Sequence, residues 1–219
     1  MRVMFKMAEK KYDLYIFDLD GTLIDSSPGI LNTVRYTLKL FNKTIPDIDT
    51  ITSFIGPPLK QSFALHPEVS EKEADEMVVA FRQEYKKGEI LNANLYDGIV
   101  PLCQRLQDDG IKMAIATNKP EQFAKKLMKY FHLDGFIPVV CGADMEGLLK
   151  KADLIKKAMD LSGVTDKKKV VMVGDTSGDA ISAEECGVDF IGVSYGFGDW
   201  KSVKYNNMVK LADEAEDIY

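Results

Sequence analysis

Histidine, cysteine and long apolar runs are scarce in this chain, and each scarcity excludes a class of function. Two histidines and three cysteines occur among the 219 residues. The cysteines, Cys103, Cys141 and Cys186, lie far apart without CxxC spacing, so we expect neither a disulfide framework nor a zinc site. No window of about 18 apolar residues is present, and the N-terminal stretch lacks the apolar core of a secretion signal. The sequence therefore predicts a cytoplasmic protein that does not contact the membrane.

An excess of basic residues is also missing. The formal net charge is −6, and no basic stretch is interleaved with aromatic residues as a nucleic-acid-binding surface would require. We therefore expect that the protein does not bind nucleic acid. Single nucleotides are not excluded as substrates. The sequence is compatible with either a monomer or a homodimer.

Short apolar runs rich in β-branched residues alternate with helical segments along most of the chain. The runs are continuous rather than alternating, which is typical of strands buried on both faces of a parallel sheet. The alternation predicts an α/β fold with a doubly wound, Rossmann-like parallel sheet. Strands are expected at residues 12–17, 112–116, 136–140, 170–173 and 190–193, and helices at 98–107, 120–131, 152–162 and 179–186.

One long interval after the first strand breaks this alternation. It contains no convincing strand and far exceeds an ordinary βα connection. A capping box at Ser70 and Glu73 precedes an apolar face at helical spacing, and residues 27–41 predict another helix. We therefore expect a catalytic core formed by residues 1–25 and 95–219. Residues 26–94 would form a small all-helical cap domain that covers the end of the first strand.

Polar side chains follow four of the predicted strands. Each of these short motifs could alone be a turn or a helix cap. Because the carboxyl ends of parallel strands meet at one edge of a sheet, we expect them to form one site. In chain order they are Asp18 and Asp20, Thr117 and Asn118, Lys150 and Lys151, and Asp175 and Asp179.

Several carboxylates at one edge require a counter-charge, since two like charges about 4 Å apart repel by roughly 4 kcal/mol at an effective dielectric near 20. A set of oxygen ligands without nearby histidine or cysteine favours Mg²⁺. A metal with a lysine and a threonine suits an anionic substrate such as a phosphoryl group. Residues i and i+2 of an extended segment face the same side, so Asp18 and Asp20 would face the site together. One could attack while the other moves a proton.

These motifs resemble those of the haloacid dehalogenase superfamily, and the match covers essentially the whole chain. The matching stretches are FDLDGTL, IATNK, KADLIKKAM and MVGDTSGD. The position of the helical segment resembles the phosphoglycolate-phosphatase-like subclass, in which a cap domain lies between the first and second motifs. The resemblance implies a Mg²⁺-dependent phosphatase that acts on a small phosphorylated metabolite through an aspartyl-phosphate intermediate.

The resemblance also implies a role for each site residue. Asp18 would be the nucleophile, and Asp20 the general acid and base, whose backbone carbonyl would also bind the metal. The phosphoryl group would be held by Thr117, by the backbone of Asn118 and by Lys151, with Asp175 and Asp179 completing the metal site. Lys151 is favoured because KAD at the helix start matches the usual KPD, with Lys150 as the alternative.

Two residues separate the activities of the superfamily. Dehalogenases lack a carboxylate at the position that corresponds to Asp20, which argues against halide displacement. β-Phosphoglucomutases usually carry a bulkier aliphatic residue in place of Thr22, so phosphate hydrolysis is favoured over phosphotransfer. The cap stretch FIGPPLKQSF, residues 54–63, resembles a substrate loop in which Lys60 could reach a carboxylate or a second phosphate. It could also simply be a turn that starts a helix. The alternatives are a 5′-nucleotidase or pyrophosphatase, then β-phosphoglucomutase-like phosphotransfer, then a non-catalytic binding protein.

Overall fold

Six parallel strands form the sheet of the computed structural model, which describes residues 12–144, 148–200 and 206–219. The strand order is β5-β4-β1-β6-β7-β8. The first strand therefore lies between β4 and β6, from which the sheet continues in opposite directions. In such a sheet the crevice beyond the carboxyl end of the central strands is where ligands bind. The strands are β1 (Leu14–Phe17), β4 (Lys112–Pro120), β5 (Val139–Ala143), β6 (Val170–Gly174), β7 (Asp189–Val193) and β8 (Met208–Ala212).

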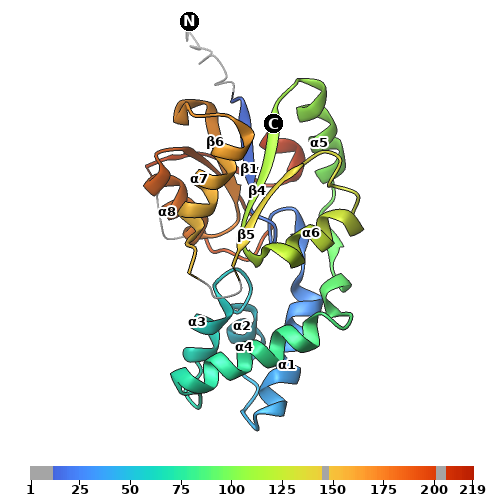
Figure 1. Cartoon of the computed structure of the whole chain (residues 1–219), viewed down its shortest axis with the longest axis vertical. Coiled ribbons are helices and arrows are strands. Elements are labelled where there is room, and N and C mark those ends of the chain that lie inside the picture. Colours follow the sequence, from blue (N-terminus) through green and yellow to red (C-terminus); the bar gives the residue numbers. More distant parts are fainter. Residues whose placement is uncertain (1–11, 145–147, 201–205) are drawn as a thin grey trace, which may run out of the picture.

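Both faces of this sheet are buried, as the continuous apolar runs predict. Leu14 and Ile16 of β1 belong to one apolar cluster, and Tyr15 and Phe17 to the other, because successive strand residues point to opposite faces. Figure 1 shows α7 (Lys151–Ser162) and α8 (Ser177–Cys186) on one face, and α5 (Ile99–Asp108) and α6 (Glu121–Tyr130) on the other. The predicted doubly wound α/β fold is confirmed.

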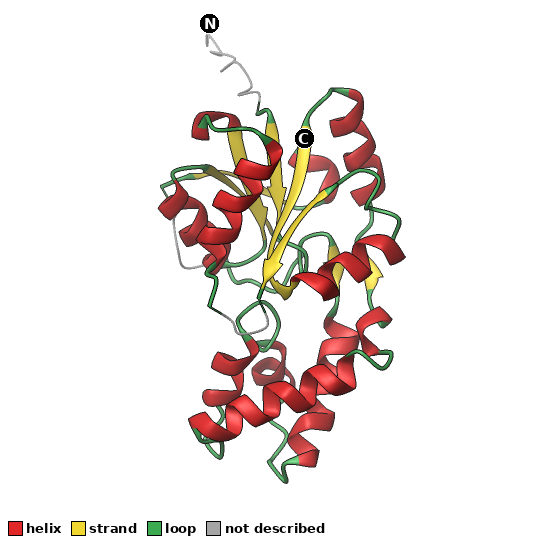
Figure 2. Cartoon of the chain, viewed as in Figure 1, coloured by secondary structure: helices red, strands yellow, loops and turns green. Residues whose placement is uncertain are grey.

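The helices of residues 26–94 gather beyond the carboxyl end of β1, apart from the sheet (Figure 2). The longest begins with the predicted capping box: the Ser70 amide donates to Glu73 Oε2 at 3.1 Å, and the Glu73 amide donates to Ser70 Oγ at 3.3 Å. Its predicted apolar face is buried, which fixes its orientation. We call residues 26–94 the cap. Its helices are α1 (Ser27–Leu40), α2 (Ile48–Thr52), α3 (Leu59–Ala64) and α4 (Glu71–Tyr85), followed by a 3₁₀ turn at Glu89–Leu91.

A two-residue ribbon lies where the chain leaves the core and returns to it. In it β2 (Ile24–Asp25) pairs antiparallel with β3 (Asn94–Leu95). The ribbon brackets the predicted cap, and the division into residues 1–25 with 95–219 and residues 26–94 stays a prediction. Among the described residues, no helix combines the length and the apolar character needed to span a membrane.

Two strand predictions need correction, and one strand of the sheet was not predicted. The third strand was expected at residues 136–140, which is wrong, because the amides of Phe136 and Ile137 donate to Leu133 O and close the turn after α6. The strand begins at Val139 instead and runs through Gly142, whose missing Cβ would lie 2.4 Å from Glu121 Cα. The second strand continues to Pro120, beyond the expected end at residue 116. The sequence did not predict β8.

Gly29 allows the start of α1 to lie against the 3₁₀ turn that ends the cap. Its amide donates to Asn92 O at 2.9 Å, and a Cβ at this position would lie 2.0 Å from Glu89 O. We expect Gly29→Ala to lower the free energy of unfolding by about 1–3 kcal/mol, the usual cost of overpacking. Urea unfolding measures this. Gly135→Ala is the control because nothing lies within 4 Å of its Cβ position, and an equal loss in both variants would contradict the prediction.

Candidate active site

The carboxyl end of β1 carries the first two predicted carboxylates. The Asp18 amide donates to Val173 O at 2.8 Å and so extends the pairing of β1 with β6. Asp18 and Asp20 are both buried and line the same cavity, as their i, i+2 spacing predicts. Gly21 then turns the chain with φ +84°, and a Cβ there would lie 2.2 Å from Asp175 Oδ2. Only glycine allows the β1 loop to approach Asp175 this closely.

Three of the predicted metal-binding carboxylates converge. Oxygen atoms of Asp18, Asp175 and Asp179 all lie within 4.8 Å of one another. Their residues are only 4%, 0% and 2% exposed. Asp175 follows β6, and Asp179 lies in the first turn of α8, so the group joins the ends of two neighbouring strands.

Lys151, the first residue of α7, contacts this carboxylate group. Its Nζ lies 2.7 Å from Asp18 Oδ1 and 2.7 Å from Asp179 Oδ1, and its side chain is 6% exposed. Lys150 is exposed and precedes the helix, where its amide donates to Asp153 Oδ2 at 3.1 Å. The geometry therefore supports Lys151, and not Lys150, as the lysine of the third motif.

Backbone and hydroxyl donors fix Asp175 and Asp179. Thr22 Oγ1 donates to Asp175 Oδ1 at 3.3 Å, and the Phe197 amide donates to Asp175 Oδ2 at 2.8 Å. Thr176 Oγ1 donates to Asp179 Oδ2 at 2.7 Å. Sequence reasoning missed these supporting roles of Thr22, Thr176 and Phe197. The glycine-rich stretch around Phe197 was the available signal for a loop that packs closely against Asp175.

The charge balance of this group fits a divalent cation. Three carboxylates share one ammonium, so two negative charges in this group lack a counter-charge when all are ionised. Burial raises the pKa of Asp18 to about 6, with the Asp179 carboxylate adding to the effect against the opposing Lys151 ammonium. Burial and Asp179 likewise raise the pKa of Asp175. A cation bound by oxygen ligands would remove this electrostatic cost.

The stabilisation by Mg²⁺ is expected to depend on pH. The pKa of Asp18 is higher in the fold, about 6, than the value near 4 of an unfolded chain. Protonation of Asp18 thus stabilises the metal-free fold at low pH, and this contribution is lost as the pH rises through about 6. Mg²⁺ must displace the proton, so its affinity should fall about tenfold per pH unit below that pKa.

Thermal unfolding with and without MgCl₂ measures this dependence. We expect a clear rise in melting temperature with MgCl₂ at pH 7.5 and a much smaller rise at pH 5.0. NaCl at matched ionic strength is the control, since it screens charge without occupying the site. Equal Mg²⁺ effects at the two pH values would count against these carboxylates as the ligands.

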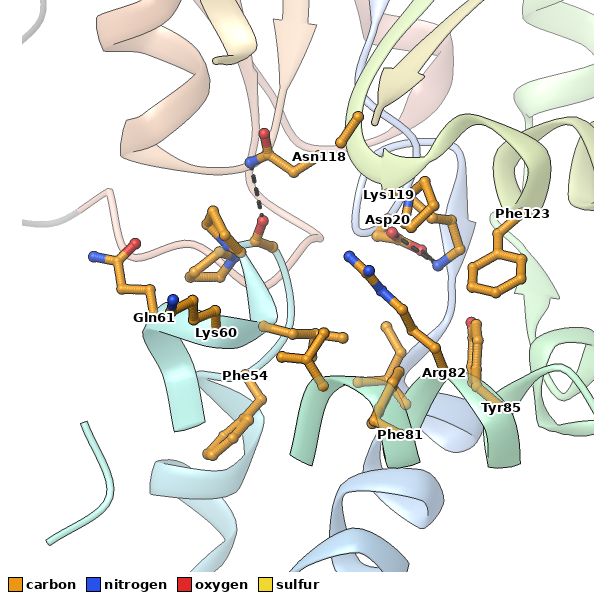
Figure 3. Close-up of a pocket in the computed structure, with 18 of the residues that line it drawn as sticks. Asp20, Phe54, Lys60, Gln61, Phe81, Arg82, Tyr85, Asn118, Lys119 and Phe123 are labelled. Atoms are coloured by element: carbon orange, nitrogen blue, oxygen red, sulfur yellow. Dashed lines mark hydrogen bonds and ion pairs between the residues drawn. The ribbon is translucent and has the colours of Figure 1, made fainter. Parts of the chain in front are cut away.

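The remaining predicted residues lie around a cavity of about 750 Å³ between the cap and the sheet (Figure 3). Thr117 and Asn118 of β4 line it together with Asp18 and Asp20. Asn118 Nδ2 donates to Gly56 O of the cap at 3.2 Å. Lys60 lines the cavity from α3, but its side chain is 57% exposed and pairs with Asp75 at 2.8 Å. The structure thus brings the core residues together and leaves Lys60 at the rim.

Asp20 has a partner that sequence reasoning missed. Lys119 Nζ lies 2.8 Å from Asp20 Oδ1 and 3.0 Å from Oδ2, and both side chains are buried. The Asp20 side chain therefore does not belong to the carboxylate group of Asp18, and its predicted metal contact through the backbone carbonyl stays a prediction. The predicted strand ended at residue 116 and so gave no reason to place Lys119 beside Asp20, which lies 99 residues away in the chain.

Comparisons with known proteins agree with this geometry. The family model "Haloacid dehalogenase-like hydrolase" matches residues 15–193. Tyrosine-protein kinase PtkA of Mycobacterium tuberculosis is 35% identical over 188 residues, which are 84% of this chain and 63% of PtkA. The chain thus spans less than two thirds of the length of this relative. A 5′-nucleotidase of Pseudomonas aeruginosa is 33% identical over 87% of this chain and 86% of its own.

A protein of Colwellia psychrerythraea named phosphoglycolate phosphatase is 30% identical over 88% of this chain and 88% of its own. A protein of Halalkalibacterium halodurans named pyrophosphatase PpaX is 32% identical over 82% of this chain and 82% of its own. Among solved structures, a predicted phosphatase from Clostridium acetobutylicum superposes with a TM-score of 0.88 at 32% identity, covering 95% of this chain and 96% of its own. The family match, the sheet order and the buried carboxylates agree with one another, and the chain belongs to the haloacid dehalogenase-like hydrolase family.

Proposed function

We propose that this protein is a Mg²⁺-dependent phosphatase that hydrolyses a small phosphorylated metabolite through an aspartyl-phosphate on Asp18. The observation that carries the proposal is the environment of Asp18. Its buried carboxylate borders the cavity, contacts Lys151 at 2.7 Å and lies within 4.8 Å of Asp175 and Asp179. A carboxylate beside fixed positive charge and further metal-type ligands suits attack on a phosphoryl group.

The reaction would proceed in two displacements at phosphorus. In the first, an Asp18 oxygen forms a bond to phosphorus while the bond to the ester oxygen breaks, and Asp20 gives its proton to the leaving alcohol. In the second, Asp20 takes a proton from water, whose oxygen attacks phosphorus and releases inorganic phosphate and the Asp18 carboxylate. Bound Mg²⁺ would supply positive charge that offsets the charge of the phosphoryl oxygens.

The other residues hold the phosphoryl group during both steps. Lys151 would neutralise its charge, and Thr117 and the backbone of Asn118 would donate hydrogen bonds to it. We assign the metal to Asp18, Asp175 and Asp179 with the backbone carbonyl of Asp20. These four acidic residues follow two neighbouring strands, β1 and β6, that pair directly in the sheet.

Phosphoglycolate or a similar small phosphate monoester is our preferred substrate class. The relatives named phosphoglycolate phosphatase, 5′-nucleotidase and pyrophosphatase support this range of substrates. Lys60 at the cavity rim is our candidate for contact with a second acidic group. Phosphotransfer of the β-phosphoglucomutase type is less favoured because Thr22, next to Gly21, supports Asp175 by a hydrogen bond that an aliphatic side chain could not make.

A panel of phosphate esters with MgCl₂ tests the proposal. Phosphoglycolate, sugar phosphates, nucleoside monophosphates and pyrophosphate are compared by kcat/KM for phosphate release, with EDTA as the metal-free control. ATP with a tyrosine-containing peptide is included because one relative is named a tyrosine-protein kinase. We expect Mg²⁺-dependent hydrolysis with one clear preference. Folded protein that releases no phosphate from any of these compounds would overturn the proposal.

A further inference from the structure

Lys119 connects the two parts of the molecule at the side chain of Asp20. It comes from the end of β4, and Asp20 from the loop after β1, so their contact joins residues 99 positions apart. The side chains of Lys119 and Asp20 are only 5% and 11% exposed. Both Asp20 oxygens lie within hydrogen-bond distance of the ammonium. A buried carboxylate held in this way has little freedom to rotate.

The cap holds Lys119 from the opposite side. Lys119 Nζ lies over the ring of Tyr85, 5.2 Å from its centroid, and Tyr85 ends α4 of the cap. The ring is buried and packs edge-on against Phe123 of α6 at 5.9 Å. Figure 3 shows Tyr85 and Phe123 beside the Lys119–Asp20 pair. The ammonium is thus confined between a carboxylate of the core and an aromatic ring of the cap.

Burial alone would disfavour the charge on Lys119. The Asp20 carboxylate outweighs this effect and raises the pKa of Lys119 above its ordinary value. Lys60 also lines the cavity and has an acidic partner, Asp75, but its side chain is more than half exposed. The Lys119 ammonium therefore contacts Asp20 and does not point toward the open part of the cavity.

We propose that Lys119 is a positioning residue for Asp20, and that Tyr85 makes this positioning depend on the cap lying against the core. This inference rests on the proposed phosphatase function, in which Asp20 moves the proton. Without Lys119, Asp20 would lose the partner that fixes its carboxylate toward the leaving group. Without the Tyr85 ring, Lys119 would keep its charge, but its ammonium would lose the aromatic contact that restricts its position.

The nature of the leaving group distinguishes positioning from other roles. Proton donation by Asp20 matters most for an alkyl phosphate, whose alcohol is a poor leaving group, and little for p-nitrophenyl phosphate, whose phenolate leaves without help. A substrate-binding lysine would instead affect KM for both compounds, and a purely structural one would lower both activities equally. Both esters share the second displacement, which also needs Asp20, so kcat cannot separate them. The diagnostic quantity is therefore the ratio of the two rates of the first displacement, measured in a single turnover as release of alcohol or phenolate.

Lys119→Met, Asp20→Asn and the double variant are compared with the wild type on the best alkyl phosphate of the panel and on p-nitrophenyl phosphate. We expect Lys119→Met to lower the single-turnover rate of alcohol release from the alkyl phosphate roughly 10²-fold, as displaced catalytic groups do, and to change the single-turnover rate of phenolate release far less. When Lys119→Met is added to Asp20→Asn, the rate on the alkyl phosphate should fall by no more than about a further twofold, because both substitutions remove the proton transfer by Asp20. Lys119→Arg should restore part of the loss.

Tyr85→Leu tests the contribution of the cap and should reproduce the leaving-group dependence in weaker form. The controls are Lys125→Met, an exposed lysine of α6 paired with Glu121, and Tyr36→Leu, an exposed tyrosine of the cap. Both should leave the ratio of the two first-displacement rates unchanged. Equal losses of the first-displacement rate on both substrates in Lys119→Met, or a change confined to KM, would overturn the inference. Failure of the wild type to hydrolyse either ester would instead refute the proposed function.

Discussion

Replacement of Asp18 by asparagine is expected to abolish phosphate release, with a loss of at least about 10⁴-fold in kcat, because the nucleophile itself is removed. Asparagine has nearly the shape of aspartate, so the buried surroundings of residue 18 can be kept. Lys151 would keep Asp179 as a partner at 2.7 Å. The loss would therefore report on chemistry and not on collapse of the site. Continuous phosphate detection at saturating substrate and MgCl₂ measures it.

The same variant has an opposite expected effect on stability. Since burial raises the pKa of Asp18 to about 6, its ionised form destabilises the metal-free fold at neutral pH relative to a neutral side chain. We expect metal-free Asp18→Asn to unfold at a higher temperature than the metal-free wild type at pH 7.5, and to gain less from MgCl₂. Inactivity combined with higher stability would separate a lost nucleophile from a damaged fold. Activity near that of the wild type would refute the mechanism.

Asp20→Asn is expected to slow turnover of alkyl phosphates by roughly 10²- to 10⁴-fold, the range typical of lost acid–base catalysis. Asp18 is still present in this variant, so the first displacement can occur with a good leaving group. The second displacement would then be slow, because water would lack its base. We expect a burst of phenolate from p-nitrophenyl phosphate, followed by slow steady-state release.

Rapid mixing and mass analysis of the acid-quenched protein measure this behaviour. A covalently phosphorylated form should accumulate in Asp20→Asn and be absent from Asp18→Asn. Asp160→Asn, at an exposed position on α7, serves as the control and should retain wild-type kinetics. A full rate on alkyl phosphates without Asp20 would show that another group moves the proton.

The parts of the fold that were predictable are those in which local pattern and burial agree. Leu14 to Phe17 form a continuous apolar run, and a strand buried on both faces needs that composition, so β1 could be located directly. The cap helix α4 could be located because Ser70 and Glu73 cap it and its apolar residues recur at helical spacing. The motif residues at strand ends were predictable because parallel strands place their carboxyl ends together.

What the sequence concealed depends on contacts between distant segments. Phe136 and Ile137 are apolar enough for a strand, yet hydrogen bonds to Leu133 hold them in a turn. Gly142 is a strand residue outside the predicted range, and its lack of a side chain permits β5 to pass close to the start of α6. The edge strand β8 shows no alternation in burial and has three consecutive exposed residues, Lys210 among them. Lys119 acquires its role only through a partner 99 residues away.

We expect the ribbon formed by Ile24–Asp25 and Asn94–Leu95 to make the predicted cap an exchangeable module. Because Asp25 and Asn94 are paired neighbours, the ends of the core meet at the point where the cap is attached. A short turn, or the cap of another family member, could connect them without changing the strand order of the sheet. The carboxylates that we propose as catalytic lie outside the exchanged segment, so one reaction centre could be redirected to new phosphate esters by changes confined to a single continuous segment that keeps an aromatic ring beside Lys119.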